Sequence, residues 1–294
     1  MNKILDEFAK ITVWSRREER APHKPLLILY ALGALLRGEY KLLFTECEKP
    51  LIELLREYGP RRRSYRPQYP FWRLQNDGVW LLDNAEKCQI RAGNTDARVS
   101  DLRANAVCGY FRPDIIDGLI ADKLLFAEVV KTILDNHFPE SLHGEIQEAC
   151  GITLEFSRAS KKRDPAFREK VLRAYQYKCA VCDFRAQIDG RHLALEAAHI
   201  KWHAAGGPDI ESNGIAMCSL HHKLFDKGAF MFRKNRLYLS ECVYGEEGTK
   251  SFQDMLVGVH GKELSQAIRK EYMPNPDWLD WHEKEVFKGP FRSV

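Results

Sequence analysis

The 294-residue sequence predicts an α+β protein with a mostly helical first domain, which contains one small β-hairpin, and a second domain of short strands and helices. Three observations predict this class. Apolar residues recur at helical spacing in several segments before residue 150. Two aromatic and aliphatic runs flank an Asn-Asp-Gly turn at 76–78. Two short-spaced pairs of metal-ligating residues follow at 179–182 and 218–221.

The first domain begins with helical segments. Residues 1–20 are expected to form one amphipathic helix, with Phe8 on its apolar face. Pro25 stands in the first turn of a second helix, which continues through the apolar run up to residue 36. A third helix is expected over 49–58, where Gly59-Pro60 ends it.

A hairpin and two further helices complete the first domain. The runs FWRLQ and VWLL (71–82) around the Asn-Asp-Gly turn predict a β-hairpin. Helical patterns return at 113–125, which opens with Pro-Asp, and at 127–136.

The polar stretch at 156–164 lacks large apolar residues after Phe156, so we place the domain boundary there. The expected domains are 1–155 and 156–294. The first 150 residues contain 22 basic and 22 acidic residues, so the net charge of +4 arises in the remainder. An excess this small does not by itself indicate nucleic-acid binding.

No apolar run approaches the roughly 20 residues that a membrane helix needs. The N-terminal segment MNKILDEFAK lacks the apolar core of a secretion signal. We therefore expect a cytoplasmic protein with no membrane partner and with reduced thiols.

Five of the eight cysteines stand alone in the sequence, and we interpret each as a small buried apolar residue. They are Cys47, Cys88, Cys108, Cys150 and Cys242. The other three belong to the spaced pairs.

Cys179-Ala-Val-Cys182 and Cys218-Ser-Leu-His221 form two short-spaced ligand pairs. Zinc prefers four sulfur or nitrogen ligands in a tetrahedron, and four protein ligands indicate a structural ion. The adjacent His222 is the alternative fourth ligand, but the C-x2-H spacing mirrors C-x2-C and favours His221.

The second domain opens with a helix from Asp164-Pro165 to about Tyr177, and a strand is expected over 193–200. The segments FREKVLRAYQYKCAVC, EAAHI and GGPDIESNGIAMCSLHHKLFDKG resemble HNH endonucleases of the McrA-like restriction type. This resemblance implies a ββα-metal fold and an endonuclease that hydrolyses phosphodiester bonds of DNA.

The resemblance also implies residue roles. His199 matches the general base, which takes a proton from the attacking water. Asn213 matches the residue that pins the loop so that the histidine keeps its orientation. His222 matches the ligand of a catalytic Mg²⁺, Mn²⁺ or similar divalent ion.

The second ligand of the catalytic ion stays open. Many HNH enzymes carry an acidic residue directly before the first histidine, and here that position is Ala198. Glu196 lies on the same side of the predicted strand as Ala198, so it is one candidate to replace the missing acidic ligand. Asp226 is another.

The first domain resembles the sulfur-binding domain of nucleases that restrict phosphorothioate-modified DNA. The resemblance rests on APHKPLLILYALG (21–33) and YPFWRLQNDGVW (69–80), with a weaker match at 102–110. It implies that Lys24, Tyr69 and Pro70 belong to the sulfur-contacting surface.

The chemistry of the modified group suits these residue types. Sulfur is larger and less hydrated than oxygen. A domain that recognises phosphorothioate therefore needs a shallow apolar depression, or dent, with cations around it. Tyr69 and Pro70 are expected to form the dent. His23, Lys24 and Arg73 are expected to contact phosphates, and Arg103 is a further candidate.

We therefore expect a modification-dependent (type IV) restriction endonuclease that recognises phosphorothioate in double-stranded DNA. One alternative is an HNH endonuclease that responds to methylated or unmodified DNA, and another is a non-catalytic, zinc-stabilised DNA-binding protein. Because a duplex needs two nicks and the chain has one HNH site, a homodimer or a pair assembled on DNA is expected.

Overall fold

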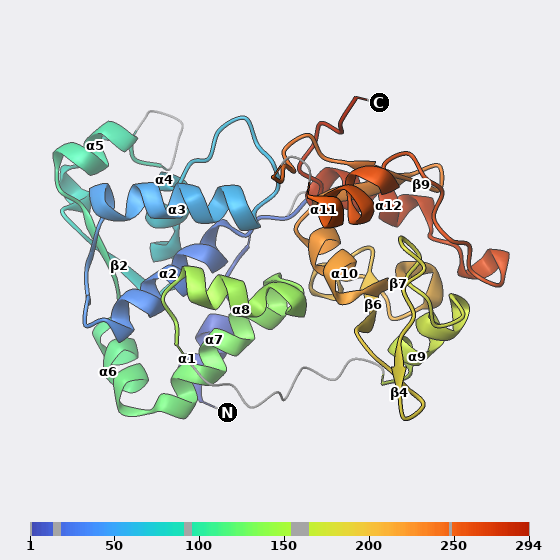
Figure 1. The fold of residues 1–294 in the computed structure, drawn as a ribbon. Coiled ribbons are helices and arrows are strands. Elements are labelled where there is room, and N and C mark those ends of the chain that lie inside the picture. The colour runs from blue at the N-terminus through green and yellow to red at the C-terminus, as the bar shows by residue number, and fades with distance from the viewer. Residues whose placement is uncertain (1, 14–18, 91–95, 154–164, 247–248, 294) are drawn as a thin grey trace. The chain divides into compact units, whose positions relative to one another are not determined.

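The computed structural model describes residues 2–13, 19–90, 96–153, 165–246 and 249–293 (Figure 1). The chain divides into two compact units, Met1–Ala159 and Ser160–Val294. The predicted boundary stretch 156–164 lies outside the described residues. The α+β fold class is confirmed, since helices and small antiparallel sheets occur in both units.

The first unit is mostly helical. Its helices are α1 (Lys3–Ala9), α2 (His23–Leu36), α3 (Phe44–Tyr58), α4 (Gln68–Arg73), α5 (Val99–Ala104), α6 (Pro113–Ala121), α7 (Lys123–His137) and α8 (Glu140–Ala149). The apolar helix α2 packs against α3, α4 and α7, and it is buried along almost its whole length. It therefore forms the centre of this core, as its continuous apolar sequence requires.

A small antiparallel sheet lies beside these helices. Its strands are β1 (Leu42–Leu43), β2 (Trp80–Asp83) and β3 (Cys108–Phe111), in the order β1-β3-β2. Trp80 of β2 lies opposite Phe111 of β3, and their rings pack edge to face. The sheet joins segments far apart in the sequence.

The predicted hairpin over 71–82 was wrong. Its first half lies in α4 and the 3-10 helix η1 (Leu74–Asp77), and only its second half is a strand. Phe71, Trp72 and Leu74 are all buried, which is a helical face rather than the alternation of a half-buried strand. Gly78, with φ of 75°, ends the 3-10 helix, so the turn sequence acts as a helix terminus.

The predicted helix over 1–20 was too long. Helix α1 ends at Ala9, and Trp14, which was assigned to this helix, lies outside the described residues. Thr12 leaves the helix because its backbone N–H donates to Asp77 Oδ1, while its carbonyl accepts from Lys24 Nζ. These tertiary bonds replace the bonds that continuation of the helix would provide.

Two other boundaries differ from the sequence prediction. Helix α3 begins at Phe44, five residues before the expected start, and it continues through Pro50. The helix expected over 113–125 stops at Ala121, because the Asp122 side chain accepts from the N–H groups of Leu124 and Leu125 and caps α7. A local capping bond thus divides one apolar stretch into two helices.

The lone cysteines divide by burial. Cys47, Cys88 and Cys150 are buried as expected, and Cys108 is half-buried. Cys242 is exposed, which contradicts its interpretation as a buried apolar residue. It follows β9 (Arg236–Leu239) in a surface turn, where its backbone N–H donates to Ser240 Oγ.

The second unit contains the expected two strands and helix. Its helices are α9 (Pro165–Ala174), α10 (Ser219–Asp226), α11 (Lys250–Met255) and α12 (Pro276–Glu285), and its strands are β4 (Gln187–Ile188), β5 (Arg191–His192), β6 (Leu195–His199), β7 (Gly214–Cys218), β8 (Phe230–Arg233) and β9 (Arg236–Leu239). Strands β6 and β7 pair in antiparallel register. Helices α9 and α10 pack against both strands. Because β7 leads directly into α10, residues of that helix lie beside β6.

In the part of the chain that the structure describes, no helix combines the length and the apolarity that crossing a membrane requires.

Candidate functional site

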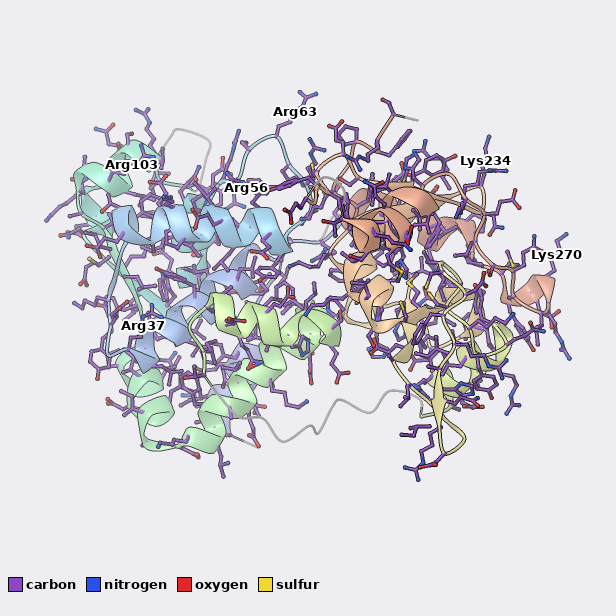
Figure 2. All side chains as sticks on the ribbon, in the orientation of Figure 1. Arg37, Arg56, Arg63, Arg103, Lys234 and Lys270 are labelled. Carbon is purple, nitrogen blue, oxygen red and sulfur yellow. The ribbon has the colours of Figure 1, made fainter. Side chains whose placement is uncertain are left out.

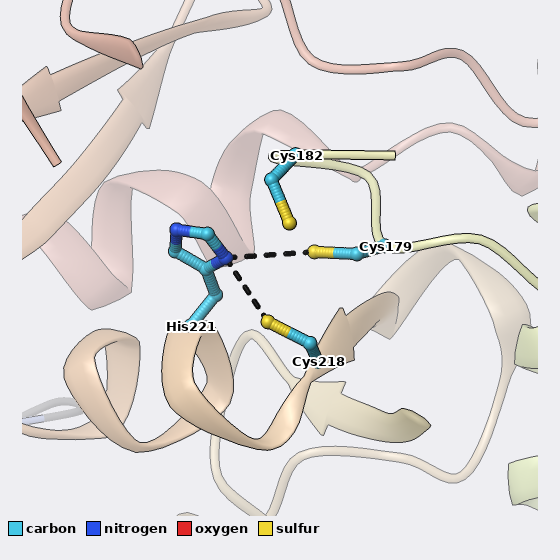
Figure 3. Close-up of side chains that lie close together, drawn as sticks. All are labelled: Cys179, Cys182, Cys218 and His221. Atoms are coloured by element: carbon cyan, nitrogen blue, oxygen red, sulfur yellow. Dashed lines mark hydrogen bonds between the residues drawn. The ribbon is translucent and has the colours of Figure 1, made fainter. Parts of the chain in front are cut away.

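Three cysteines and one histidine meet in the second unit. The ligand atoms of Cys179, Cys182, Cys218 and His221 all lie within 4.8 Å of one another, and Figure 3 shows the four side chains gathered around one point. The two Cys179-x-x-Cys182 thiols come from the turn after α9, Cys218 ends β7, and His221 lies in the first turn of α10. Three sulfurs and one imidazole nitrogen in this arrangement fit a tetrahedral zinc ion.

The imidazole of His221 is held so that Nδ1 faces the thiols. Its Nδ1 lies 3.2 Å from Cys218 Sγ and 3.6 Å from Cys179 Sγ, and its Nε2 donates to the carbonyl of Met255 at 2.8 Å. Burial acts to lower the pKa of His221, but the contacts with both cysteines raise it to about 10. Hydrogen bonds from Cys182 and Cys218 lower the pKa of Cys179, so the cluster holds a thiolate, the form that binds metal.

His222, the next residue in the chain, lies between two carboxylates. Its Nδ1 is 2.6 Å from Glu196 Oε2, and its Nε2 is 3.2 Å from Asp226 Oδ2. Ser219 Oγ donates to the other oxygen of Glu196 at 2.7 Å. The structure therefore brings both proposed helpers to His222, but on opposite sides of its ring.

The charges of this group are strongly coupled. The hydrogen bond from His222 lowers the pKa of Glu196 to about 2. Burial acts to lower the pKa of His222, but Asp226 and Glu196 raise it to about 9. In the metal-free protein His222 is therefore protonated at neutral pH, between the carboxylates of Glu196 and Asp226. A divalent cation suits the negative charge of these carboxylates in the same way.

His199 ends β6 and is nearly buried. Its ring stacks on Phe167 of α9 at a centroid distance of 4.1 Å, and its Nε2 lies 2.8 Å from Asp209 Oδ1. The ring of His203 lies 6.1 Å away, edge to face. The sequence reasoning missed Asp209, although it stands in the glycine-rich loop between His199 and the next motif residue.

Asn213 is fully buried and holds that loop. Its Oδ1 accepts from the backbone N–H of Lys201 at 2.9 Å, and its Nδ2 donates to the carbonyls of Lys201 and Pro208 at 3.0 and 2.9 Å. Gly207 is required beside it, because a Cβ there would lie 1.8 Å from the Lys201 carbonyl oxygen. These bonds tie the backbone of Lys201 and Pro208 to the Asn213 side chain.

In the first unit, α2 and α4 pack together and bring most of the expected DNA-contacting residues to one surface. His23 and Lys24 begin α2, and Tyr69, Pro70 and Arg73 lie on α4. Pro70 is buried and Tyr69 is half-buried. Burial, followed by the charges of Arg62 and Arg73, lowers the pKa of His23.

Two arginines flank the ring of Tyr69. Arg73 lies over the ring at 4.8 Å and Arg66 at 5.7 Å, and Arg66 also donates to the Tyr69 hydroxyl at 2.9 Å. Arg66 was not singled out for this site from the sequence. Its position just after Arg61-Arg62-Arg63, and three residues before Tyr69, was the available indication.

Buried acids hold two of these cations. Lys24 Nζ lies 2.5 Å from Asp77 Oδ2, and Arg73 binds both oxygens of Asp96 at 2.6 Å. The two ion pairs fix the positions of the Lys24 ammonium group and the Arg73 guanidinium group.

Arg103 is not brought to this surface by any contact in the described residues. It lies on α5 and binds both carboxylate oxygens of Glu48. Figure 2 labels it at α5, away from Arg63 in the loop between α3 and α4. Its candidate role in sulfur or DNA contact therefore has the least support among the proposed residues.

Comparison with known families matches both units. Residues 1–155 match the model described as "ScoMcrA-like, DNA sulfur-binding domain". Residues 179–233 match the model of an HNH endonuclease. The match to the second model supports a DNA-hydrolysing enzyme that uses a divalent metal. Among curated proteins, none matched the chain.

Three solved structures show partial similarity to this chain. The sulfur-binding domain of ScoMcrA complexed with phosphorothioated DNA is 19% identical, with a TM-score of 0.45, over 52% of this chain and 97% of that chain. The sulfur-binding domain of SprMcrA complexed with phosphorothioated DNA is 22% identical, with a TM-score of 0.42, over 50% and 91%. The type IV phosphorothioation-dependent restriction endonuclease ScoMcrA is 17% identical, with a TM-score of 0.42. The match covers 50% of this chain but only 28% of that chain.

Proposed function

Because this chain belongs to the family of ScoMcrA-like DNA sulfur-binding domains, we propose that it is a type IV restriction endonuclease that recognises phosphorothioate-modified DNA. The observation that carries this proposal is the presence of an HNH endonuclease match in the same chain. The first unit reads the modification, and the second hydrolyses phosphodiester bonds. DNA is accordingly its substrate and its partner.

The surface around Tyr69 supplies what recognition of this group requires. The Tyr69 ring offers apolar area for a poorly hydrated sulfur, and the adjacent Pro70 is buried in the same helix. Arg66 and Arg73 flank the ring, so they place positive charge where the remaining phosphate oxygens would lie. His23 lies close to Arg73 and extends the same surface. Lys24 is held in place by Asp77.

In the second unit, His199 acts as the general base. Its imidazole takes a proton from water, the water oxygen bonds to phosphorus, and the bond from phosphorus to the 3′ oxygen breaks as that oxygen takes a proton from solvent. Asn213 holds the 201–208 loop in place through three buried hydrogen bonds. The products of this reaction carry a 5′-phosphate and a 3′-hydroxyl.

Glu196 and His222 would hold the catalytic Mg²⁺, Mn²⁺ or similar ion. The Glu196 side chain is 44% exposed and that of Asp226 only 2%, so DNA reaches an ion on the Nδ1 side of His222 and not one on the Nε2 side. Asp226 instead contacts Nε2 of His222 and so orients the ring. When bound, the ion stabilises negative charge on the phosphate and on the leaving oxygen.

The structural zinc would be held by Cys179, Cys182, Cys218 and His221. Because all four positions are protein ligands, this ion takes no part in hydrolysis. It joins the turn after α9 to the β7–α10 junction, which carries His222. Loss of zinc therefore displaces the catalytic ligand as well as weakening the fold.

We expect two copies of the chain to act on one duplex, because one HNH site makes one nick at a time. A homodimer, or two molecules that meet on the duplex, satisfies this expectation.

Binding measurements test the first half of the proposal. The His199→Ala variant, which does not cut, is titrated with three matched duplexes that carry phosphorothioate, a methylated base or no modification. Tighter binding to the phosphorothioate duplex is the expected result, and Tyr69→Ala in the same background should abolish the preference. Preference for the methylated duplex, or equal binding to all three, would contradict the proposal.

A further inference from the structure

We propose that Asp209 is a positioning residue for hydrolysis: it fixes the His199 imidazole in the tautomer with the proton on Nε2 and the lone pair on Nδ1. This inference rests on the proposed nuclease function and deepens it. It accounts for a carboxylate in the catalytic loop that neither the zinc cluster nor the catalytic-ion ligands use.

The geometry specifies a directed hydrogen bond. His199 Nε2 and Asp209 Oδ1 are 2.8 Å apart, and the exposed fractions of the two side chains are 7% and 17%. A carboxylate accepts but does not donate, so the proton of a neutral imidazole resides on Nε2. At this burial the bond is worth more than it would be in water.

The surroundings leave His199 little freedom to turn. Phe167 stacks on one face of the ring with planes 16° apart, and His203 meets it edge to face. The backbone of Ile200 bonds to Asn213 O, which fixes the end of β6. A ring flip would break the bond to Asp209, so the carboxylate selects between the two orientations.

Fixing the tautomer matters for a general base. The nitrogen that receives the proton from water must carry a lone pair, and the other nitrogen must stay protonated. A carboxylate opposite Nε2–H also stabilises the imidazolium that forms when the base has taken its proton. Asp209 supplies both effects without touching DNA or the catalytic ion.

The decisive variant is Asp209→Asn. The amide keeps the size of the side chain, but its Nδ2 can donate to Nε2 and thereby move the imidazole proton to Nδ1, which would block the base. We expect the turnover rate to fall about 10²- to 10⁴-fold, as expected when a catalytic imidazole takes the wrong tautomer. DNA affinity, zinc content and melting temperature should match those of the parent protein.

A spectroscopic readout separates positioning from a structural role. Long-range ¹H–¹⁵N spectra of the zinc-loaded full chain, without DNA or Mg²⁺, report which imidazole nitrogen carries the proton, and His199→Gln assigns the resonances. The parent should show the proton on Nε2, and Asp209→Asn should show it on Nδ1. An unchanged tautomer in the variant, or an Nδ1 proton in the parent, would overturn the proposal.

Two further variants complete the test. Glu211→Gln is the matched control, because it neutralises a carboxylate in the same loop that the structure does not pair with His199. It should leave both spectrum and rate unchanged. If Asp209→Asn fails to fold, Asp209→Ala replaces it and should give a mixture of tautomers. If the parent does not cut DNA, the proposed function fails, while the spectra still decide the role of Asp209.

Discussion

His222 Nδ1 lies 2.6 Å from Glu196 Oε2, although the two residues are 26 positions apart in the chain. The β6–β7 pairing produces this contact: Glu196 lies on β6, and β7 continues into α10, which carries His222. An acid on a strand and a base on the adjoining helix are thus placed like two ligands of one ion.

Glu196→Gln should weaken Mn²⁺ binding by more than about 100-fold, because it removes a ligand oxygen and its charge. Asp226→Asn should weaken it by only about 10- to 100-fold, the usual effect of a residue that orients a ligand. Mn²⁺ binding to the zinc-loaded protein, followed by electron paramagnetic resonance, measures both. A larger effect for Asp226→Asn would place the ion on the opposite side of His222.

Cys182→Ser should reduce zinc content from one ion per chain to well below one and destabilise the second unit by several kcal/mol, because structural zinc contributes its binding energy to folding. Metal analysis and thermal unfolding measure these effects. Cys242→Ser is the matched control, since Cys242 is exposed and lies outside the cluster. Equal zinc content in both variants would show that Cys182 is not a ligand.

The zinc cluster and the β6–β7–α10 unit could be predicted from the sequence because their determinants are local. Each ligand pair is closed by a three-residue spacing, and tetrahedral coordination then brings the pairs together. Strand β6 and its partner are also linked by one loop. For His199, Asn213 and His222, order along the chain was therefore sufficient to place them in one unit.

The hairpin failed for the opposite reason. The Asn-Asp-Gly turn is a local indication, but the partner of β2 is β3, which lies beyond α5. Packing of α4 against α2 and α3 favours a helix before the turn. Asp209 could not be found either. Its contact with His199 depends on the path of a loop, which no periodic pattern encodes.

Asn213→Ala should destabilise the second unit by about 2–5 kcal/mol, because it leaves one buried N–H and two carbonyls without their partner. Urea unfolding measures this change. Ser212→Ala is the control, since the recorded bond of Ser212 uses its backbone carbonyl. A change below 0.5 kcal/mol for Asn213→Ala would refute the loop-pinning role.

DNA affinity should be higher at pH 5.5 than at pH 7.5. Burial, then Arg62 and Arg73, lowers the pKa of His23 below its usual value of 6.5, so the DNA-free protein holds it neutral at pH 7. A nearby phosphate raises this pKa again, so binding takes up a proton. Titrations at pH 5.5 and 7.5 test this, and His23→Gln should remove the pH dependence.

The lowered pKa of His23 has the opposite effect on the stability of the DNA-free protein, which falls as the pH falls. Because the unfolded chain protonates His23 more readily than the folded protein does, its contribution to stability is present above pH 6.5 and is lost as the pH falls through the lower, folded-state pKa. In DNA-free protein, His23→Gln should therefore flatten the loss of stability below pH 6.5. Denaturant unfolding across this range measures the effect, and an unchanged slope would show that His23 is not the titrating group.

Cleavage of matched plasmids tests the central claim most directly. The full chain is incubated with phosphorothioate-modified and unmodified plasmid in Mg²⁺ or Mn²⁺, alongside His199→Ala. We predict that only the modified plasmid is cut and that the variant cuts neither. Equal cutting of both plasmids would contradict recognition of sulfur, and no cutting of either would contradict the assignment as a phosphorothioate-dependent nuclease.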